Sequence, residues 1–313
     1  MKKISFIIPC YGSEKTIAEV VAEIKETIST REGYDYEIVL VADASPDNVY
    51  EVIHKLALED KKIKGINLAK NFGQHSALMT GFNIATGDIM VILDDDGQTP
   101  ANEMFILIDE IEKGSDLVFA KYYKKKHNIF RNMGSKLNDL MASSLIGKPK
   151  GLSIMSYFAC KKFVIDEAVK YKNSYPYIYG LLLRSTNKVS NVLIHHRERE
   201  EGGSTYTFKK LVSLWMNGFT AFSVKPLRIA TFSGMAVALI GFIFAMYVVV
   251  EKIIHPDQPI GYPSLMAVLL FIGGVLMLML GIIGEYIGRI YITLNNSPQY
   301  VVREAINVEE YNE

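Results

Sequence analysis

The sequence predicts an α/β domain, with a mostly parallel sheet flanked by helices, joined to a two-helix transmembrane hairpin. Short apolar runs alternate with amphipathic, helix-type patterns through the first 120 residues. This alternation is typical of parallel strands connected by right-handed crossover helices. Two long stretches without charge follow each other near the C-terminal end, which indicates a pair of membrane spans. A chain of 313 residues is long enough for both units.

The alternating elements can be placed one by one. Strands are predicted at residues 5–8, 37–41, 63–68, 89–93 and 117–120, and helices at residues 14–29, 47–58, 75–85 and 102–111. The first of these helices shows apolar residues at steps of three and four: Ile17, Val20, Val21, Ile24 and Ile28. No GxGxxG follows the first strand and no Walker A sequence occurs, so neither a dinucleotide site nor a P-loop is predicted.

Residues 229–250 carry no charge, and at about 1.5 Å per residue they cover roughly 30 Å, the thickness of one bilayer core. Residues 265–283 form a second uncharged stretch, which extends to residue 287 across Glu285. The alternative is a pair of buried helices in a soluble protein, but the tandem arrangement favours the membrane. The connection between the stretches is expected to turn the chain because it contains three prolines, Pro256, Pro259 and Pro263.

Basic residues flank the outer ends of this hairpin: Lys225, Arg228, Arg289 and Arg303. Positive charge stays on the cytoplasmic side, so we expect two spans in the inner or plasma membrane with both termini in the cytoplasm. The predicted parts are a cytoplasmic domain (1–207), an amphipathic interfacial segment (208–228), the hairpin (229–288) and a cytoplasmic tail (289–313). Gly284 and Gly288 have GxxxG spacing, so close helix packing is expected and a homo-oligomer could use the same face.

An amphipathic helix is predicted at residues 208–222, immediately before the first span. Its apolar residues fall at steps of three and four: Phe208, Leu211, Val212, Trp215, Phe219 and Phe222. We interpret it as a helix that lies on the bilayer in contact with membrane lipids. The alternative is a helix packed on the core of the preceding domain.

The composition excludes some classes of protein. Lysine plus arginine and aspartate plus glutamate number 34 each, so no general affinity for nucleic acid is expected. The two cysteines, Cys10 and Cys160, provide no disulfide framework, and Cys10 is expected to be a buried thiol in a reducing cytoplasm. The N-terminus does not resemble a signal peptide, because Pro9 ends its short apolar run.

A block of acids, Asp94-Asp95-Asp96-Gly97-Gln98, directly follows the apolar run 89–93. A strand of this kind delivers its acids to the carboxyl edge of a sheet, where open α/β folds bind ligands. Adjacent carboxylates repel one another unless a cation compensates them, and oxygen ligands at such an edge suit Mg²⁺ or Mn²⁺ shared with a phosphate. The alternative is a solvated acidic loop.

Several segments share their order and spacing with one known family: Ile7-Ile8-Pro9-Cys10-Tyr11, Asp43-Ala44-Ser45-Pro46-Asp47, Asn71-Phe72-Gly73-Gln74-His75, the acidic block with Thr99-Pro100, Arg199-Glu200-Glu201-Gly202-Gly203-Ser204-Thr205-Tyr206, and Phe222-Ser223-Val224-Lys225-Pro226-Leu227-Arg228. Together they resemble glycosyltransferase family 2, in the branch of dolichyl-phosphate mannose synthase and the bacterial polyprenyl-phosphate glycosyltransferases. The resemblance covers nearly the whole chain. It implies a nucleotide-diphospho-sugar transferase fold and an inverting, single-displacement transfer.

The resemblance also implies roles for individual residues. Pro9 and Tyr11 would border the nucleotide base, Asp43 would accept hydrogen bonds from it, and Glu14 could add a contact. Asp94 and Asp96 would be the acids of the D-x-D motif beside Asp95, with Asp96, Gln98 and Asp94 holding the metal. Arg199 would approach phosphate oxygens of the acceptor near Ser204. Arg131 lies in the basic segment 121–150 and is a candidate for the donor phosphate; a solvated loop or a patch on anionic lipid is the alternative for that segment.

The chain departs from the family pattern at several positions. Ala42 replaces the first acid of the usual pair after the second strand, and Thr205 replaces a lysine that would contact phosphate. Residues 151–158 carry no acid, so no general base is assigned. For His195 and His196 a structural or phosphate-orienting role is expected rather than catalysis, and His75 is expected to start a helix.

The leading hypothesis is an integral membrane enzyme that moves a sugar from a nucleotide donor to polyprenyl phosphate at the cytoplasmic face. One alternative is a transferase acting on another membrane acceptor, such as a lipid-linked oligosaccharide or a glycerolipid. Another is a non-catalytic membrane scaffold of the same fold. A processive polysaccharide synthase is disfavoured, because the sequence lacks QxxRW and has two predicted spans, too few to wall a secretion channel.

Overall fold

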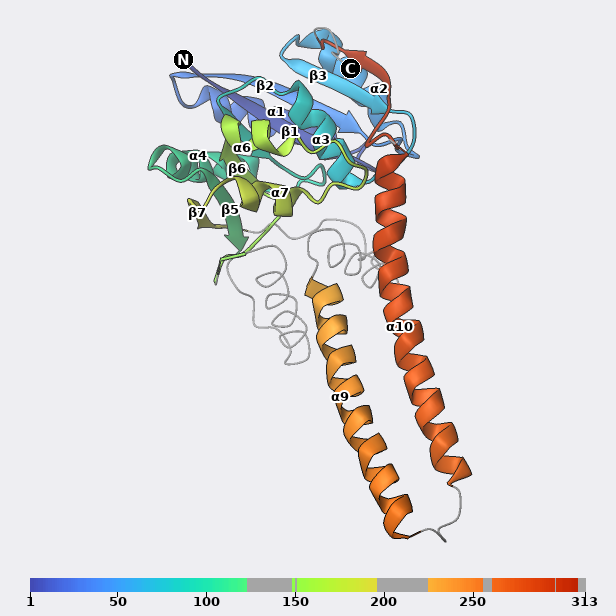
Figure 1. The fold of residues 1–313 in the computed structure, drawn as a ribbon. Helices are drawn as coiled ribbons and strands as arrows, with labels where there is room; N and C mark the ends of the chain where they lie inside the picture. Colours follow the sequence, from blue (N-terminus) through green and yellow to red (C-terminus); the bar gives the residue numbers. More distant parts are fainter. Residues whose placement is uncertain (123–147, 150, 196–224, 256–260, 296, 309–313) are drawn as a thin grey trace. The chain divides into compact units, whose positions relative to one another are not determined.

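The structure is a computed structural model that describes residues 1–122, 148–149, 151–195, 225–255, 261–295 and 297–308 (Figure 1). The chain divides into two compact units. Unit 1 contains Met1–Thr205 together with Asn296–Glu313, and unit 2 contains Tyr206–Asn295.

Unit 1 is built on an eight-stranded mixed sheet with the strand order β7-β5-β6-β4-β1-β2-β3-β8. The strands are β1 (Lys2–Cys10), β2 (Tyr34–Ala42), β3 (Ile63–Leu68), β4 (Ile89–Ile92), β5 (Leu117–Tyr122), β6 (Phe158–Lys161), β7 (Val189–Ile194) and β8 (Val302–Ile306). The central strands β3, β2, β1 and β4 are parallel, as the sequence predicts. Strand β6 is antiparallel to β4 and β5, and β8 is antiparallel to β3.

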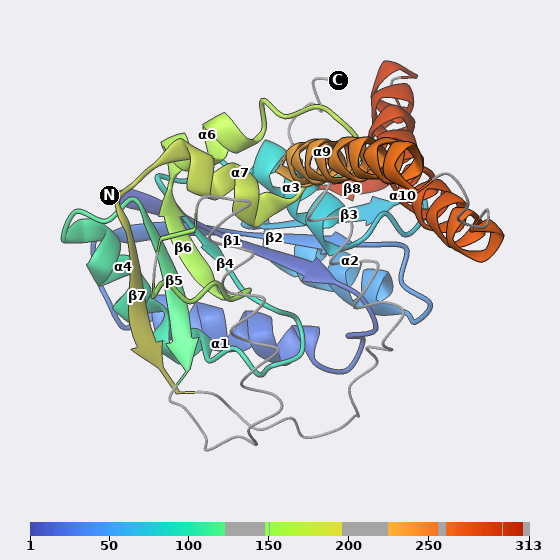
Figure 2. The same cartoon turned by 60° about the horizontal axis from the view of Figure 1, so that its bottom comes forward.

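Helices cover both faces of this sheet (Figure 2). They are α1 (Ile17–Ser29), α2 (Val49–Glu59), α3 (Gln74–Ile84), the 3₁₀ turn η1 (Ala101–Glu103), α4 (Met104–Glu112), α6 (Lys162–Ala168) and α7 (Ile178–Ser185). Helices α1, α2 and α4 bury their apolar faces with Ile4, Phe6 and Ile8 of β1 in one core. Helix α3 lies on the opposite face, with α6 and α7 on its side of the sheet.

Gly81 sets how closely α3 approaches the sheet. A Cβ atom at this position would collide with Cγ2 of Ile7 on β1. Because glycine has no Cβ, the helix packs directly on the strand, at a cost in helix propensity of about 1 kcal/mol. Helix α3 packs on β1 and β2, and its first residue, Gln74, reaches Asp94 just after β4.

Two strands and two helices of unit 1, β6, β8, α6 and α7, lie outside the predicted elements. The sequence shows a strand-like apolar run at residues 192–194, just before His195, and β7 extends it to Val189–Ile194. Strand β8 lies in the predicted tail, residues 289–313. It is an edge strand with exposed Arg303 and Glu304, so it lacks the apolar alternation by which strands are recognised.

Unit 2 contains two long helices, α9 (Lys225–Ile254) and α10 (Tyr262–Leu294). Large apolar side chains are exposed along both, among them Leu239, Phe242, Phe271 and Met277. Within the described residues, one helical stretch, Phe271–Gly288, is long and apolar enough to cross a membrane, and Ala230–Phe244 is a shorter apolar helical stretch. Residues 208–222, including Trp215, lie outside the described residues.

A buried ion pair network joins the amino-terminal halves of β1, β2 and β3. Glu37 of β2 is 2% exposed, and its carboxylate meets the ammonium groups of Lys3 at 2.7 Å and Lys64 at 3.0 Å. It also accepts hydrogen bonds from Ser5 Oγ at 2.6 Å and from the Thr86 amide at 2.5 Å. Burial raises the pKa of Glu37, but these partners outweigh burial and lower the pKa from 4.5 to about 2.

This network predicts a pH-dependent contribution to stability. The pKa of Glu37 is lower in the folded protein than in the unfolded chain, so its contribution is complete above about pH 4.5 and is lost as the pH falls towards about 2. A shift of this size corresponds to roughly 3 kcal/mol. We expect Glu37→Gln to lower the melting temperature of the detergent-solubilised protein by roughly 6 °C or more at pH 7. The difference from wild type should shrink below about pH 4.5.

The matched control is Asp35→Asn, which removes an exposed ion pair with Lys62 and should change the melting temperature little. A Glu37→Gln variant with the same melting temperature as the wild type at pH 7 would show that the network does not stabilise the fold.

Candidate active site

The loops that follow β1, β2, β3 and β4 meet at the carboxyl edge of the parallel strands. The pairing of β1 with β2 and with β4 places the carboxyl ends of these three strands next to one another at the same edge of the sheet. The site residues predicted on these loops are therefore gathered at one edge: Tyr11, Glu14, Asp43, Asp94, Asp95, Asp96 and Gln98. Pro9 lies just inside the edge, as a buried residue of β1 opposite Val41.

Asp95 is folded back onto the protein. Its Oδ2 accepts a hydrogen bond from the Tyr11 amide at 2.8 Å, and its main-chain oxygen accepts one from Thr16 Oγ1 at 2.6 Å. Burial raises the pKa of Asp95 to about 6. Asp95 thus links the loop after β4 to the loop after β1 and to the start of α1. A direct contact of its carboxylate with the nucleotide sugar stays a prediction.

Asp94 and Asp96 are the other two acids of the block. Asp94 accepts hydrogen bonds from Ser156 Oγ and from Gln74 Nε2, the latter at 3.4 Å. Burial raises the pKa of Asp94, and the charge of Asp96 raises it further. Within the described part of the chain no lysine or arginine forms an ion pair with either acid. Their negative charge is therefore left uncompensated by the residues that the structure describes.

Asp43 anchors the loop that precedes α3. Its two carboxylate oxygens accept hydrogen bonds from the amides of Phe72 and Gly73, both at 2.7 Å. Gly73 has a φ of 89°, which only glycine adopts at little cost, and this conformation presents both amides to one carboxylate. Each oxygen of Asp43 keeps a second lone pair, so the predicted contact with a nucleotide base remains open.

The loops after β1 and β2 hold each other. The Gly12 amide donates to Ser45 Oγ at 2.8 Å, and the Glu14 amide donates to Asp47 Oδ2 at 2.9 Å. In return, the Glu14 carboxylate accepts a hydrogen bond from the Asn48 amide at 3.1 Å, at the start of α2. Glu14 therefore has a local structural role, and its contact with a nucleotide stays a prediction. The Tyr11 side chain is 55% exposed at this edge.

Two of the described histidines, His195 and His75, contact neighbouring side chains of unit 1. His195 accepts or donates a hydrogen bond through Nδ1 with Glu103 at 2.8 Å, and its amide donates to the same carboxylate at 3.0 Å. His75 is the second residue of α3, and its ring lies edge-on to those of Tyr177 and Tyr179, with centroids 5.4 and 5.5 Å away. Burial lowers the pKa of His75 to about 4, so its imidazole is neutral at physiological pH.

Three predicted phosphate-contacting residues, Arg131, Arg199 and Ser204, lie outside the described residues, as does His196. The structure in turn adds residues that the sequence patterns did not single out. Ser156 and Gln74 both reach Asp94. Tyr122 at the end of β5 has a pKa raised to about 12, by burial and by the charges of Asp94 and Asp96, so its phenol remains protonated.

The acidic edge fits a divalent cation that shares its coordination sphere with a ligand. The described residues contain no group of three or more His, Cys, Asp or Glu side chains arranged as a metal site. Asp94 and Asp96 nevertheless place two mutually repelling carboxylates together, and the chain turns back at Gln98, whose amide donates to Asp96 Oδ1 at 3.1 Å. Mg²⁺ is commonly held by one or two carboxylates plus substrate phosphates, and this edge supplies the two carboxylates.

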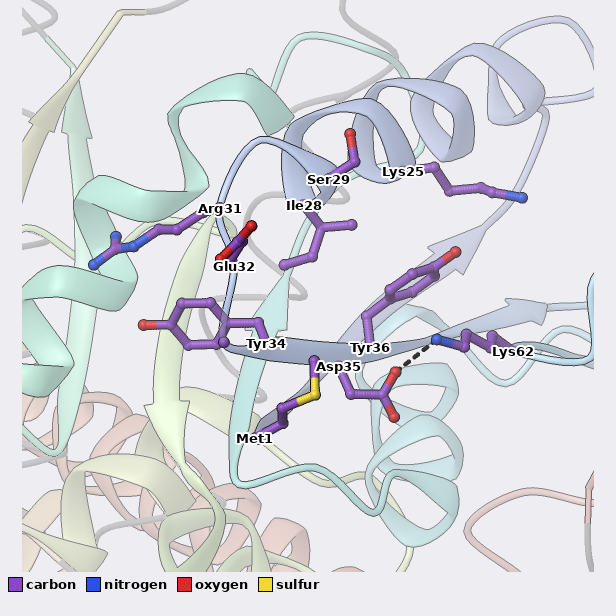
Figure 3. A pocket seen from close by; sticks show the side chains of 11 residues that line it. Met1, Lys25, Ile28, Ser29, Arg31, Glu32, Tyr34, Asp35, Tyr36 and Lys62 are labelled. Atoms are coloured by element: carbon purple, nitrogen blue, oxygen red, sulfur yellow. Dashed lines mark hydrogen bonds and ion pairs between the residues drawn. The ribbon is translucent and has the colours of Figure 1, made fainter.

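A cavity of about 580 Å³ lies at the opposite, amino-terminal edge of β1 and β2 (Figure 3). Tyr34 and Tyr36 line it at the start of β2, roughly 25 Å along the strand from Asp43 at about 3.3 Å per residue. Its three basic side chains are already paired with carboxylates: Lys25 with Asp60, Arg31 with Asp109, and Lys62 with Asp35. Because of its distance from Asp43, the cavity is separate from the acidic edge.

Known proteins resemble this chain over most of its length. The model of glycosyl transferase family 2 matches residues 5–170, and that of the GtrB C-terminal hairpin matches residues 225–290. The undecaprenyl-phosphate 4-deoxy-4-formamido-L-arabinose transferase of Proteus mirabilis is 30% identical over 315 residues, covering 100% of this chain and 96% of the relative. The protein of the same name from Yersinia pestis is 31% identical over 313 residues, covering 99% and 95%.

A solved structure shares the fold. Mannosyl-3-phosphoglycerate synthase from Rubrobacter xylanophilus aligns with a TM-score of 0.51 at 14% sequence identity, covering 69% of this chain and 71% of that chain. The family match spans the strands and loops that form the acidic edge, from β1 to α6. The chain belongs to glycosyl transferase family 2, and it is a glycosyltransferase.

Proposed function

We propose that this protein transfers a sugar, with inversion, from a nucleotide-sugar donor to polyprenyl phosphate at the cytoplasmic face of a membrane. The observation that carries the proposal is the pair Asp94 and Asp96 at the carboxyl edge of a family 2 fold, beside loops whose other acids are bonded to main-chain amides. The names of the full-length relatives, which are undecaprenyl-phosphate sugar transferases, support the choice of acceptor.

The donor would bind across the loops after β1 and β2. Tyr11 presents an exposed ring there, and aromatic faces stack on bases. Asp43 is held by two amides and has lone pairs left for the donors on a base. In this arrangement Asp95 positions Tyr11. The diphosphate would then lie over Asp94 and Asp96.

A divalent cation, Mg²⁺ or Mn²⁺, would be held by Asp94, Asp96 and Gln98 together with the diphosphate. When bound, such an ion compensates the charge that develops on the leaving nucleoside diphosphate, an effect of several kcal/mol. Ser156 and Gln74 hold Asp94 by hydrogen bonds to its two oxygens, so the carboxylate is already oriented. Arg131 is proposed to add positive charge at the donor phosphate.

The reaction requires little proton transfer by the protein. An oxygen of the lipid phosphate attacks the anomeric carbon, forming a new C–O bond while the bond to the diphosphate oxygen breaks and its electron pair leaves with the nucleotide. A phosphate monoester is already an anion near neutral pH, so no strong general base is required. Arg199 is proposed to bind the acceptor phosphate bidentately near Ser204, which a lysine cannot do.

The hairpin is proposed to cross the membrane twice. Helices α9 and α10 have 30 and 33 residues, enough to span a bilayer core of roughly 30 Å at about 1.5 Å per residue. The match of residues 225–290 to a family hairpin supports this proposal. A lipid acceptor requires the site to work at the bilayer surface, and the segment 208–228 is proposed to lie there.

The function can be tested with membranes from cells that express the protein. We expect one member of a panel of radiolabelled nucleotide sugars to label the lipid extract as a sugar joined to polyprenyl phosphate. Asp96→Ala should reduce this labelling on the order of 100-fold or more, because charge compensation at the leaving group is lost. Arg199→Lys should reduce it strongly, because the bidentate grip on phosphate is lost.

The control is Asp166→Asn, which removes an exposed carboxylate on α6 and should leave the rate unchanged. Transfer to a soluble, non-phosphorylated acceptor in preference to polyprenyl phosphate would contradict the proposed acceptor. A protein that binds no nucleotide sugar at all would indicate a scaffold.

The topology can be tested by labelling with an impermeant thiol reagent in intact cells. Both native cysteines are buried, and burial raises the pKa of each thiol, so the background should be low. We expect Asp257→Cys, between α9 and α10, to be labelled in intact cells. Asp166→Cys should be labelled only after the cells are permeabilised. The reverse pattern would place the acidic edge on the outer side and contradict a cytoplasmic donor.

A further inference from the structure

The segment that follows α10 returns to unit 1 and bonds to two of its loops. We call residues 297–303 the strap. At its start, the Ser297 carbonyl oxygen accepts a hydrogen bond from Ser174 Oγ at 2.6 Å. Gln299 Nε2 then donates to the carbonyl oxygens of Asn173 at 2.9 Å and Tyr171 at 3.3 Å. The strap thereby fixes the loop between α6 and α7.

The other end of the strap fixes the end of β3. The Ala69 amide donates to the Val301 oxygen at 2.8 Å, and Arg303 Nη2 donates to the Ala69 oxygen at 2.9 Å. Arg303 is an extra residue in the ladder, because Leu68 pairs with Val302 while the adjacent Asn67 pairs with Glu304. A bulge of this kind re-aims a side chain and is often found next to active sites. Here the bulged residue is the one whose guanidinium reaches Ala69.

Both loops held by the strap lead to the acidic edge. Ala69 lies three residues before Phe72, and the amides of Phe72 and Gly73 bind Asp43. The next residue, Gln74, reaches Asp94. The loop at 171–174 leads directly to Tyr177 and Tyr179, whose rings pack on His75 in the first turn of α3. The contacts therefore form a continuous series. The strap bonds to Ala69, the loop after Ala69 leads into α3, the start of α3 packs on α7, and the loop before α7 bonds to the strap.

We propose that the strap is a positioning device for the donor site. Its hydrogen bonds hold the loop 69–73 and the first turn of α3 in the conformation that places amides on Asp43 and Gln74 beside Asp94. Within the described part of the chain, the side chains of Gln299 and Arg303 bond to Tyr171, Asn173 and Ala69 and not to a predicted donor-site residue. Both therefore act through Ala69 and the loop 171–174. The link to the nucleotide rests on the proposed function, whereas the link to the loop conformation does not.

The same strand offers a matched control. Asn307 follows β8 at its other end, where Nδ2 donates to the Ala57 oxygen at 2.6 Å and to the Ile63 oxygen at 2.8 Å. Ile63 begins β3, whereas Ala69 follows its end, so Asn307 stabilises the edge of the sheet that lies away from the acids. Asn307→Ala should destabilise unit 1 without loosening the loop 69–73.

The test compares Gln299→Ala/Arg303→Ala, Arg303→Lys and Asn307→Ala with the wild type in the full-length, detergent-solubilised protein. Hydrogen–deuterium exchange is measured for residues 70–77, and binding of UDP and of GDP, each with Mn²⁺, is measured by calorimetry. We expect the double variant to exchange at least tenfold faster at residues 70–77 and to bind the nucleotide roughly 5- to 30-fold more weakly, the loss expected for one or two hydrogen bonds.

In the transfer assay, KM for the donor should rise in the double variant while kcat stays within about twofold. Arg303→Lys, in which Gln299 is intact, should retain most of the wild-type affinity, because its ammonium can still donate to the Ala69 oxygen. Asn307→Ala should lower the melting temperature and change neither exchange nor affinity. Unchanged exchange at residues 70–77 in the double variant, or the same loosening in Asn307→Ala, would overturn the proposal. If the wild type binds neither nucleotide, the proposed function fails, and the exchange comparison still decides the role of the strap.

Discussion

The site depends on one kind of interaction, a carboxylate at the end of one parallel strand that accepts hydrogen bonds from the amides of a neighbouring loop. Asp95 after β4 binds the Tyr11 amide after β1, and Asp43 after β2 binds the Phe72 and Gly73 amides after β3. Such charge-assisted bonds are stronger than neutral ones and fix direction. Together with the bond from the Glu14 amide to Asp47, which joins the loops after β1 and β2, they connect all four loops at one edge of the sheet.

Among the residues that the structure describes, no basic side chain compensates the charge of Asp94 and Asp96. Asp95 and Asp43 bind main-chain amides, whereas Asp94 is oriented by Ser156 and Gln74 and is repelled by Asp96. Two carboxylates held together in this way favour a divalent cation and disfavour a bare diphosphate. A nucleotide sugar arriving with its metal ion satisfies both requirements. The strap adds a further constraint on the site, because it bonds to the loop whose amides bind Asp43.

The sequence predicts the parts of the fold that repeat a local pattern. Strands β1 to β5 alternate with helices whose apolar residues face the sheet, and the acidic block lies at the end of β4 as expected. Strands β6 and β8 carry no such pattern: β6 is four residues long, and β8 is a polar edge strand paired with a partner more than 230 residues away. Ser156 could not be identified as a partner of Asp94, because only the antiparallel pairing of β6 with β4 brings it there. The different roles of Asp94, Asp95 and Asp96 could likewise not be predicted from the sequence. The three residues are identical, and the path of the loop decides what each carboxylate contacts.

We propose that Asp94 and Asp96 bind a nucleotide diphosphate through a shared divalent cation. Electron paramagnetic resonance of Mn²⁺ measures this directly, because free and bound Mn²⁺ give different signals. For the purified protein we expect tight Mn²⁺ binding when UDP or GDP is present, little binding without nucleotide, and loss of the nucleotide-dependent binding in Asp96→Ala. Nucleotide that binds with the same affinity in Mn²⁺ and in excess chelator, with no change in the Mn²⁺ signal, would contradict the account.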